Sequence, residues 1–332
     1  MCAIIILDKT QMAFRCCDAS MGQRNKCILC NFIAEYSHIE SLDDTVGALC
    51  FCGGGNMKFL IRKECLHYWQ KENKKISKFQ LYSQIWFRQV VLKKFEIPYL
   101  EMFITTKCNL RCKHCSNLIP TLNNRQNYEI STLIEWLDEL LSKIDCLYRL
   151  KIHGGEVFLH PRLAEFVAYV KNQPKIKSIR LTTNGTIIPA DNILQLIASS
   201  KIVVQISDYR LPNIKTQQLI DKFKKFGVRY IYLKDQTWKD FGGITLRDGN
   251  RFDDCSMKRC SSFYEGKIYL CSRAAIMTKS GYIPDDGISV YLPKNQLRQQ
   301  LKKMYGGKLS IACNYCDGDT KYAKDISAGE QE

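Results

Sequence analysis

The chain has 332 residues, of which 45% are hydrophobic and 25% are charged. These proportions exclude a disordered chain, and the length suits two or three domains of about 100–200 residues each. No stretch reaches the roughly 20 consecutive apolar residues of a membrane span. The N-terminal apolar run Ala3–Leu7 ends at Asp8, which is too early for a signal peptide. We therefore expect a cytoplasmic protein.

The formal net charge is +16 and the chain has 17 cysteines. The charge is compatible with a phosphate-bearing partner, but a Lys-rich solvated surface gives the same value, and no RNA-recognition or zinc-finger signature accompanies it. We expect neither a nucleic acid nor a membrane as partner. The cysteines do not suit a disulfide framework, which is typical of much shorter secreted chains. They indicate metal or cluster ligation instead.

Residues 1–97 are an N-terminal region whose role the sequence does not reveal. The segment between Ile76 and Val90 has apolar residues at helical spacing, and Pro98 marks the end of the region. The spacing of its cysteines leaves two possibilities open, a metal site and unligated structural thiols. The residues concerned are Cys16, Cys17, Cys27, Cys30, Cys50, Cys52 and Cys65, together with the glycine run Gly53–Gly55.

Residues 98–235 alternate short apolar runs with longer amphipathic segments. The predicted strands are Leu100–Thr105, Arg149–His153, Ser178–Thr182, Ile202–Ile206 and Arg229–Leu233. The predicted helices are Ile130–Lys143, Arg162–Asn172, Asp191–Ser199 and Ile214–Phe226. Such alternation builds βαβ units and a parallel sheet, in which ligands bind at the carboxyl ends of the strands. The unusual polar clusters of this region all follow predicted strands, so we expect them to share one rim.

The first of these clusters contains Cys108, Cys112 and Cys115 within eight residues. Three thiolates on one loop suit an iron–sulfur cluster, and they leave one iron of a four-iron cluster without a protein ligand. A zinc site with a distant fourth ligand, for which His114 is a candidate, is the alternative.

This loop, preceded by Ile104–Thr106 at a strand end, resembles the signature of the radical S-adenosylmethionine (SAM) superfamily. The resemblance extends from Tyr99 to Cys316. It implies an α/β fold, with a partial (β/α)6 barrel, an N-terminal extension and a small cluster-binding C-terminal domain. It also implies a [4Fe-4S] cluster whose open iron binds SAM, and a 5′-deoxyadenosyl radical that removes a hydrogen atom from the substrate. His114 would then lie near the adenine.

Gly154, Gly155 and Glu156 match the GGE motif of the same family. The two glycines allow the backbone to approach a ligand closely, and a carboxylate at position 156 suits the ammonium group of SAM. We therefore expect all three residues to bind the cofactor.

Polar residues also follow the next two predicted strands. Within the run Thr182–Gly185, Thr183 and Asn184 lie where the family contacts the ribose and carboxylate of SAM, and Ser207 and Asp208 hold the corresponding place one strand later. A capping or turn role is the alternative for each of these side chains.

Residues 236–332 carry a second cysteine group, whose expected ligands are Cys260, Cys271, Cys313 and Cys316. The spacing C-x5-G-x4-C followed by CxxC resembles a twitch domain, a shortened relative of the SPASM domain, and this resemblance implies one auxiliary iron–sulfur cluster. Cys255 is an extra thiol that could replace Cys260 or act as an acid–base group. Zinc is the alternative occupant of this site.

The resemblance implies an enzyme whose electrons come from a donor such as flavodoxin or ferredoxin. Its substrate is expected to be a small molecule of the sugar or cyclitol type, which is oxidised or epimerised. Two alternatives stay open. One is modification of a peptide or protein side chain, and the other is a non-catalytic iron–sulfur or zinc protein.

Overall fold

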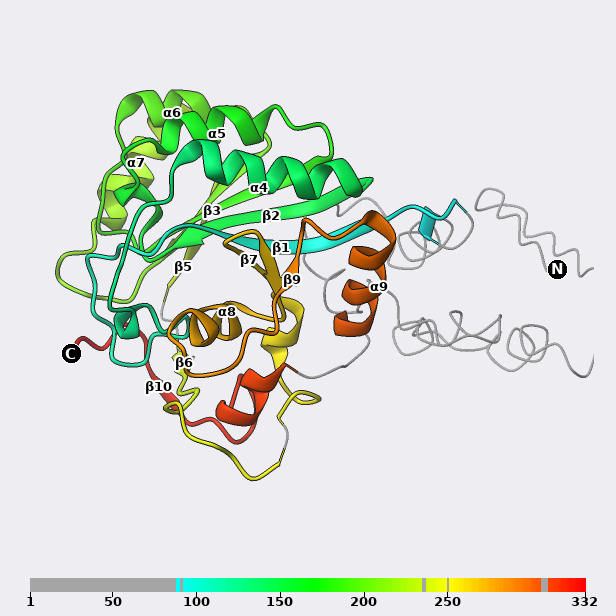
Figure 1. Cartoon of the computed structure of the whole chain (residues 1–332). Helices are drawn as coiled ribbons and strands as arrows, with labels where there is room; N and C mark the ends of the chain where they lie inside the picture. Colours follow the sequence, from blue (N-terminus) through cyan, green and yellow to red (C-terminus); the bar gives the residue numbers. More distant parts are fainter. Residues whose placement is uncertain (1–87, 90–91, 235–236, 250, 306–309) are drawn as a thin grey trace, which may run out of the picture. The chain divides into compact units, whose positions relative to one another are not determined.

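The computed structural model describes residues 88–89, 92–234, 237–249, 251–305 and 310–332 (Figure 1). The seven cysteines named above in the N-terminal region and the Gly53–Gly55 run lie outside the described residues, as does almost all of the helix expected between Ile76 and Val90. Every cysteine from Cys108 onward lies within them.

Five parallel strands form the centre of the main sheet, and each overlaps a strand predicted from the sequence. They are β1 (Glu96–Thr105), β2 (Cys146–Gly154), β3 (Ile176–Thr183), β4 (Ile202–Ser207) and β5 (Tyr230–Leu233). Their spatial order is β5-β4-β3-β2-β1, and each neighbouring pair is parallel. All ten residues of β1 are buried, as expected for a strand covered on both faces. The predicted parallel α/β sheet is confirmed.

Four helices connect these strands and lie together on one face of the sheet (Figure 1). They are α4 (Ile130–Lys143), α5 (Leu163–Lys171), α6 (Asp191–Ile197) and α7 (Thr216–Phe226). The bounds of α4 are those predicted, because its apolar residues recur at helical spacing: Ile130, Leu133, Leu137, Leu140 and Leu141 are all buried. α7 is followed by Gly227, whose φ of 68° is the left-handed conformation typical of a helix C-terminus.

The C-terminal part of the chain extends the same sheet. β7 (Ser262–Tyr264) pairs in parallel with the other side of β1, and β8 (Lys267–Tyr269) and β9 (Ile288–Ser289) continue antiparallel. The sheet thus has eight strands with β5 and β9 at its two ends. Among the described residues these end strands are not paired with each other, so the expected partial barrel is open.

The remaining elements follow β5 or connect the strands already named. β6 (Thr237–Lys239) pairs antiparallel with β10 (Asp325–Ser327) in a small second sheet. Two further helices are α8 (Ser272–Lys279) and α9 (Lys294–Tyr305). Short 3-10 helices are η5 (Ile119–Thr121), η6 (Val157–Leu159), η7 (Ser256–Arg259) and η8 (Ile311–Tyr315).

The domain boundaries expected from the sequence do not coincide with breaks in the main sheet. The boundary at Pro98 lies inside β1, which begins at Glu96. The boundary after residue 235 separates β1 from β7, its neighbour in the sheet. The predicted core and the predicted C-terminal domain therefore share one sheet.

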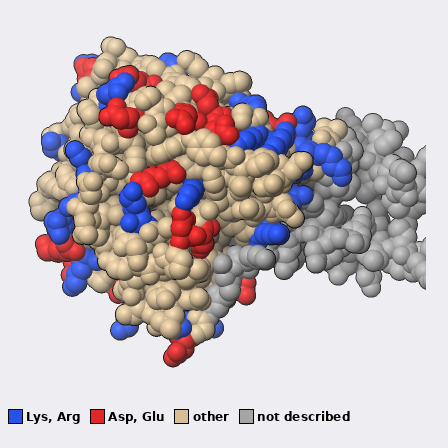
Figure 2. Space-filling view, in the orientation of Figure 1, with Lys and Arg blue, Asp and Glu red and all other residues tan. Residues whose placement is uncertain are grey.

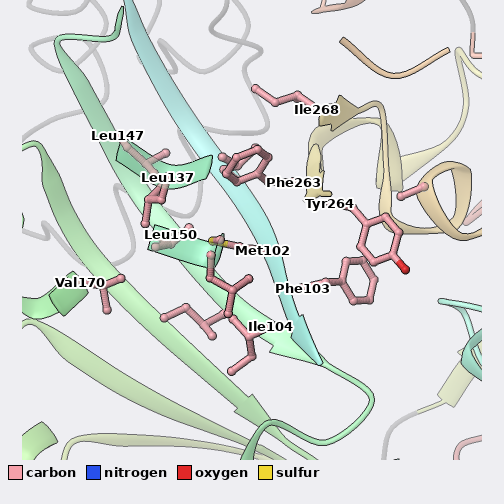
Figure 3. Packing of buried hydrophobic residues seen from close by; sticks show 14 of the residues in the cluster. Met102, Phe103, Ile104, Leu137, Leu147, Leu150, Val170, Phe263, Tyr264 and Ile268 are labelled. Atoms are coloured by element: carbon pink, nitrogen blue, oxygen red, sulfur yellow. The ribbon is translucent and has the colours of Figure 1, made fainter. Parts of the chain in front are cut away.

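The hydrophobic core joins these two parts. Met102 and Ile104 of β1 pack among side chains of β2, α4 and α5, whereas Phe263 and Ile268 come from β7 and β8 (Figure 3). Phe103 of β1 makes an edge-to-face contact with Tyr264 of β7, with 5.2 Å between ring centroids. Burial of side chains of this size stabilises the fold by about 1.5–3 kcal/mol each.

The net positive charge is not gathered into one patch on the face seen in Figure 2, where Lys and Arg are interspersed with Asp and Glu. No helix within the described ranges has the length and apolar character needed to cross a membrane.

Candidate cluster and cofactor site

The three cysteines of the CxxxCxxC loop follow β1 and line one cavity of about 210 Å³. Gly154, Gly155, Thr183, Asn184 and Ser207, from the ends of β2, β3 and β4, line the same cavity. Parallel strands place their carboxyl ends on one side of a sheet, which is why residues so far apart in the sequence meet here.

The thiols of this loop are largely shielded from water. Burial raises the pKa of Cys108 to about 12 and also raises those of Cys112 and Cys115. Without a metal these groups are protonated at neutral pH, and ligation replaces their protons. A set of three partly or fully buried cysteines around one cavity therefore fits an iron–sulfur cluster.

The two glycines of the GGE motif lie against the cysteine loop. A Cβ at Gly154 would stand 2.0 Å from the Thr105 carbonyl oxygen, and a Cβ at Gly155 would stand 2.3 Å from that of Lys107 and 2.6 Å from Cys108 Cβ. The Glu156 amide donates to the Lys107 carbonyl at 2.8 Å. The close approach that requires glycine in this structure is therefore between two backbone segments, and both glycines also line the cysteine cavity.

Glu156 is fully buried and does not line the cavity. Its carboxylate accepts hydrogen bonds from the Asn184 amide (2.7 Å), the Thr183 hydroxyl (2.8 Å) and the Phe158 amide (3.0 Å). Burial raises its pKa to about 7, although these three donors oppose the shift. In this arrangement Glu156 holds the end of β3 and does not face the cavity.

Asn184 connects the end of β3 to the cysteine loop. Its Nδ2 donates to Asn109 Oδ1 at 3.2 Å and lies 3.9 Å from Cys108 Sγ. Its Oδ1 accepts from the backbone amide and the hydroxyl of Thr186, and that hydroxyl accepts from Asn109 Nδ2 at 2.7 Å. Since both ends of the amide are engaged, the orientation of Asn184 toward the thiol is fixed.

Two residues expected at the cofactor lie elsewhere. His114 Nδ1 is 3.2 Å from Asp240 Oδ1, and both residues line a separate cavity that also contains Cys115. Asp208 accepts hydrogen bonds from the Arg210 amide and from the hydroxyls of Thr216 and Tyr232, and it does not line the cysteine cavity. Asp208 thus has the turn role that the sequence left open.

Sequence reasoning missed a buried polar group on β1 and β2. Glu101, Lys151 and His153 line the same cavity as the three cysteines. Lys151 Nζ lies 2.8 Å from Glu101 Oε1, and Ser272 of α8 donates to Glu101 Oε2 at 2.6 Å. Burial opposes ionisation of Glu101, but the charge of Lys151 and the hydrogen bonds from Lys151 and Ser272 outweigh it and lower its pKa to about 2. A charged residue in the middle of an apolar strand was the available signal.

The C-terminal residues also contact the cysteine loop. Cys112 and Gln331 form an antiparallel bridge, flanked by hydrogen bonds from Lys113 N to Glu330 O and from Glu332 N to Arg111 O. Gln331 Oε1 accepts from the Arg111 amide at 2.8 Å, which orients its Nε2 toward Cys112 Sγ at 3.3 Å. No sequence signal connects residues this far apart.

The second cysteine group contains Cys255 in place of Cys260. Cys255, Cys271, Cys313 and Cys316 line a small cavity between η7, α8 and η8, whereas Cys260 does not line it. Gly318 lies close to Cys255, since a Cβ added there would be 2.8 Å from its Sγ. Our assignment of Cys260 to this set is therefore not supported by the arrangement of the thiols.

Three of these thiols, those of Cys271, Cys313 and Cys316, have an environment like that of the first group. Cys271 Sγ accepts from the Ala274 amide at the N-terminus of α8, and Cys316 Sγ accepts from the Gly318 amide. Burial raises the pKa of Cys313 to about 12.

Within the part of the chain that the structure describes, no three His, Cys, Asp or Glu side chains are arranged to hold a single metal ion.

Curated proteins with similar sequences share only part of this chain. A GTP 3′,8-cyclase of Syntrophomonas wolfei is 32% identical over 98 residues, which are 28% of this chain and 29% of that protein. A GTP 3′,8-cyclase of Stenotrophomonas maltophilia is 34% identical over 97 residues, 28% of each chain. The matched region thus spans less than a third of these relatives.

Among solved structures, BtrN in complex with AdoMet and 2-DOIA has a TM-score of 0.43 at 18% identity, covering 68% of this chain and 98% of that one. Native anSMEcpe with bound AdoMet has a TM-score of 0.45 at 14% identity, covering 67% and 89%. The family model described as Radical SAM superfamily matches residues 102–254, which include the CxxxCxxC loop and the GGE motif. The chain therefore carries a radical SAM domain.

Proposed function

We propose that this protein is a radical SAM enzyme in which Cys108, Cys112 and Cys115 hold a [4Fe-4S] cluster and SAM binds in the adjoining cavity. The observation that carries the proposal is the meeting of the three thiols with Gly155, Asn184 and Ser207 around that cavity. When bound, the reduced cluster and SAM supply a 5′-deoxyadenosyl radical that removes a hydrogen atom from the substrate.

The residues of the chain contribute orientation and exclusion of water. Glu156 fixes Thr183 and Asn184 through one hydrogen bond each, and Asn184 in turn braces the loop at Cys108. Gly154 and Gly155 allow this loop to lie directly against the end of β2. Glu156 is thus a positioning residue, and the polar groups of the cavity wall are those available to SAM.

We assign an auxiliary iron–sulfur cluster to Cys255, Cys271, Cys313 and Cys316. Four partly buried cysteines around one cavity support this set, and thiolate ligands suit both iron–sulfur clusters and zinc. Visible absorbance separates the two occupants, because zinc is colourless.

The substrate we favour is a polar small molecule such as a sugar or cyclitol. Glu101, Lys151, His153 and Gln205 line the cavity beside the cysteines and offer hydrogen bonds that hydroxyl groups can satisfy. The GTP named for the curated relatives is not carried over, because those matches cover less than a third of each protein. An external one-electron donor such as flavodoxin or ferredoxin is required.

The enzyme proposal is tested by anaerobic reconstitution with iron and sulfide, followed by SAM and a reductant. We expect 5′-deoxyadenosine from the wild type and none from Cys112→Ala. Cys313→Ala should lose iron and keep some uncoupled SAM cleavage. Failure of the fully loaded wild type to form 5′-deoxyadenosine would contradict the proposal.

The auxiliary ligand set is tested by a matched pair of variants. Cys255→Ala should lose the iron and the visible absorbance of the auxiliary cluster, whereas Cys260→Ala should retain both. Of these two cysteines, only Cys255 lines the cavity. Iron content and absorbance of the two reconstituted proteins measure the difference. The opposite outcome would restore Cys260 as the ligand.

A further inference from the structure

Arg273 lies between the two cysteine groups. It is the second residue of α8, two positions after Cys271, and only 5% of it is exposed. It lines the cavity of the auxiliary group together with Cys316, and it also lines a second cavity of about 430 Å³ that contains Cys115.

The guanidinium of Arg273 has little compensation from the protein. One terminal nitrogen donates to the Gly242 carbonyl at 2.6 Å, and the group lies 5.8 Å from the centre of the Phe241 ring. Its Nε is buried without a hydrogen-bond partner, and the ion pairs among the described residues include none with Arg273. A buried cation without a paired anion is costly, so a nearby negative charge is expected.

The neighbouring carboxylates already have other partners. Asp240 lies 3.2 Å from His114, and Asp317 pairs with Arg247 at 2.9 Å. The groups next to Arg273 that gain negative charge are the thiols on its two sides, since metal ligation removes their protons.

We propose that Arg273 is a shared counter-cation, which balances the negative charge of both clusters from a position between them. This inference rests on the proposed function, because it requires a cluster in each cysteine group. A fixed positive charge beside a cluster favours its reduced form, so Arg273 raises the reduction potentials of both clusters together. In this role Arg273 acts on the clusters through its charge alone, without contacting substrate or SAM.

The test compares full-length wild type, Arg273→Met and Arg273→Lys after anaerobic reconstitution, without SAM or substrate. Each protein is equilibrated with redox dyes at a series of potentials, and electron paramagnetic resonance and visible absorbance report the reduced fraction of each cluster. In Arg273→Met the ratio of reduced to oxidised cluster at a given potential should fall about tenfold at both sites, which is about 59 mV for a one-electron couple. Arg273→Lys should stay near the wild type, because it keeps the charge.

Arg298→Met is the matched control. Arg298 also donates to backbone carbonyls, those of Lys93 and Lys94, but it lines neither cavity. Its removal should leave both potentials unchanged. Unchanged potentials in Arg273→Met, or a shift at one cluster alone, would overturn the shared role.

Failure to load the clusters is also informative. If Arg273→Met takes up no iron while Arg273→Lys loads normally, the requirement for charge is supported; if neither variant loads, Arg273 has a structural role and the inference is wrong. The wild type tests the proposed function separately. If the wild type binds iron in one cysteine group alone, the assignment of an auxiliary cluster is wrong, and Arg273 cannot balance the charge of two clusters.

Discussion

Three polar residues, Glu101, Lys151 and His153, give the cavity of the first cysteine group its polar wall on β1 and β2. Glu101 and Lys151 neutralise each other inside the sheet, and His153 lies beside them with its ring 4.2 Å from that of Phe103. Burial lowers the pKa of His153 to about 3, despite the opposing charge of Glu101. The imidazole is therefore neutral throughout the physiological range, and it can exchange hydrogen bonds with a substrate without a change of charge.

This shift predicts a dependence of stability on pH. An unfolded histidine has a pKa of about 6.5, so below that pH the unfolded chain takes up a proton that the folded chain refuses. The free energy of unfolding should therefore fall as pH decreases from 6.5 toward 3, by about 2 kcal/mol at pH 5 for this residue. Urea unfolding of the metal-free protein at pH 7 and pH 5 measures the effect. His153→Phe should show a smaller loss, and an equal loss in both proteins would contradict the assignment.

At the level of elements, the ends of β1 and β2 act as one unit with the cysteine loop. Backbone hydrogen bonds join Gly155 N to Thr105 O and Glu156 N to Lys107 O. The GGE motif thus supports the cysteine loop through close backbone contacts. Any side-chain atom added at Gly155 would obstruct these contacts.

Gly155→Ala should displace the loop, because its Cβ would lie 2.3 Å from a backbone oxygen that cannot rotate away. We expect a loss of stability of roughly 1–3 kcal/mol, as for other overpacked sites, and a clear loss of iron at the first cysteine group. Gly243→Ala is the control, since a Cβ there meets nothing within 4 Å. Iron content and thermal unfolding of the two variants are compared. Equal iron loading would show that the loop tolerates the displacement.

At the scale of the whole molecule, the C-terminal part completes the sheet that carries the radical SAM domain. β7 covers the side of β1 away from β2, and Ser272 supplies a hydrogen bond to Glu101. The α8 helix also carries Arg273, which lines the cavity of the second cysteine group and a separate cavity that contains Cys115. The first cysteine group thus depends on residues more than 150 positions later, and on the contact between Cys112 and Gln331.

Truncation after Lys234 should therefore abolish folding rather than release a smaller enzyme. The fragment would expose the edge of β1 and the side chains that pack against Phe263 and Tyr264, and exposed apolar edges promote aggregation. We expect the yield of soluble protein to fall about tenfold or more relative to the full chain. Size-exclusion chromatography after parallel expression measures it. A monomeric fragment with a cooperative unfolding transition would show that the predicted domain boundary is real.

The sequence by itself determined the parallel α/β sheet, the bounds of α4 and the grouping of polar residues at strand ends, because these depend on local periodicity and on the geometry of parallel strands. Only the tertiary structure decided that Cys255 and not Cys260 lines the second cysteine cavity, that Glu156 holds Asn184, and that His114 and Asp208 do not line the cavity of the first cysteine group. Neighbouring positions such as 255 and 260 differ in the direction of their side chains. That direction is set by packing against distant segments, which spacing along the chain does not encode.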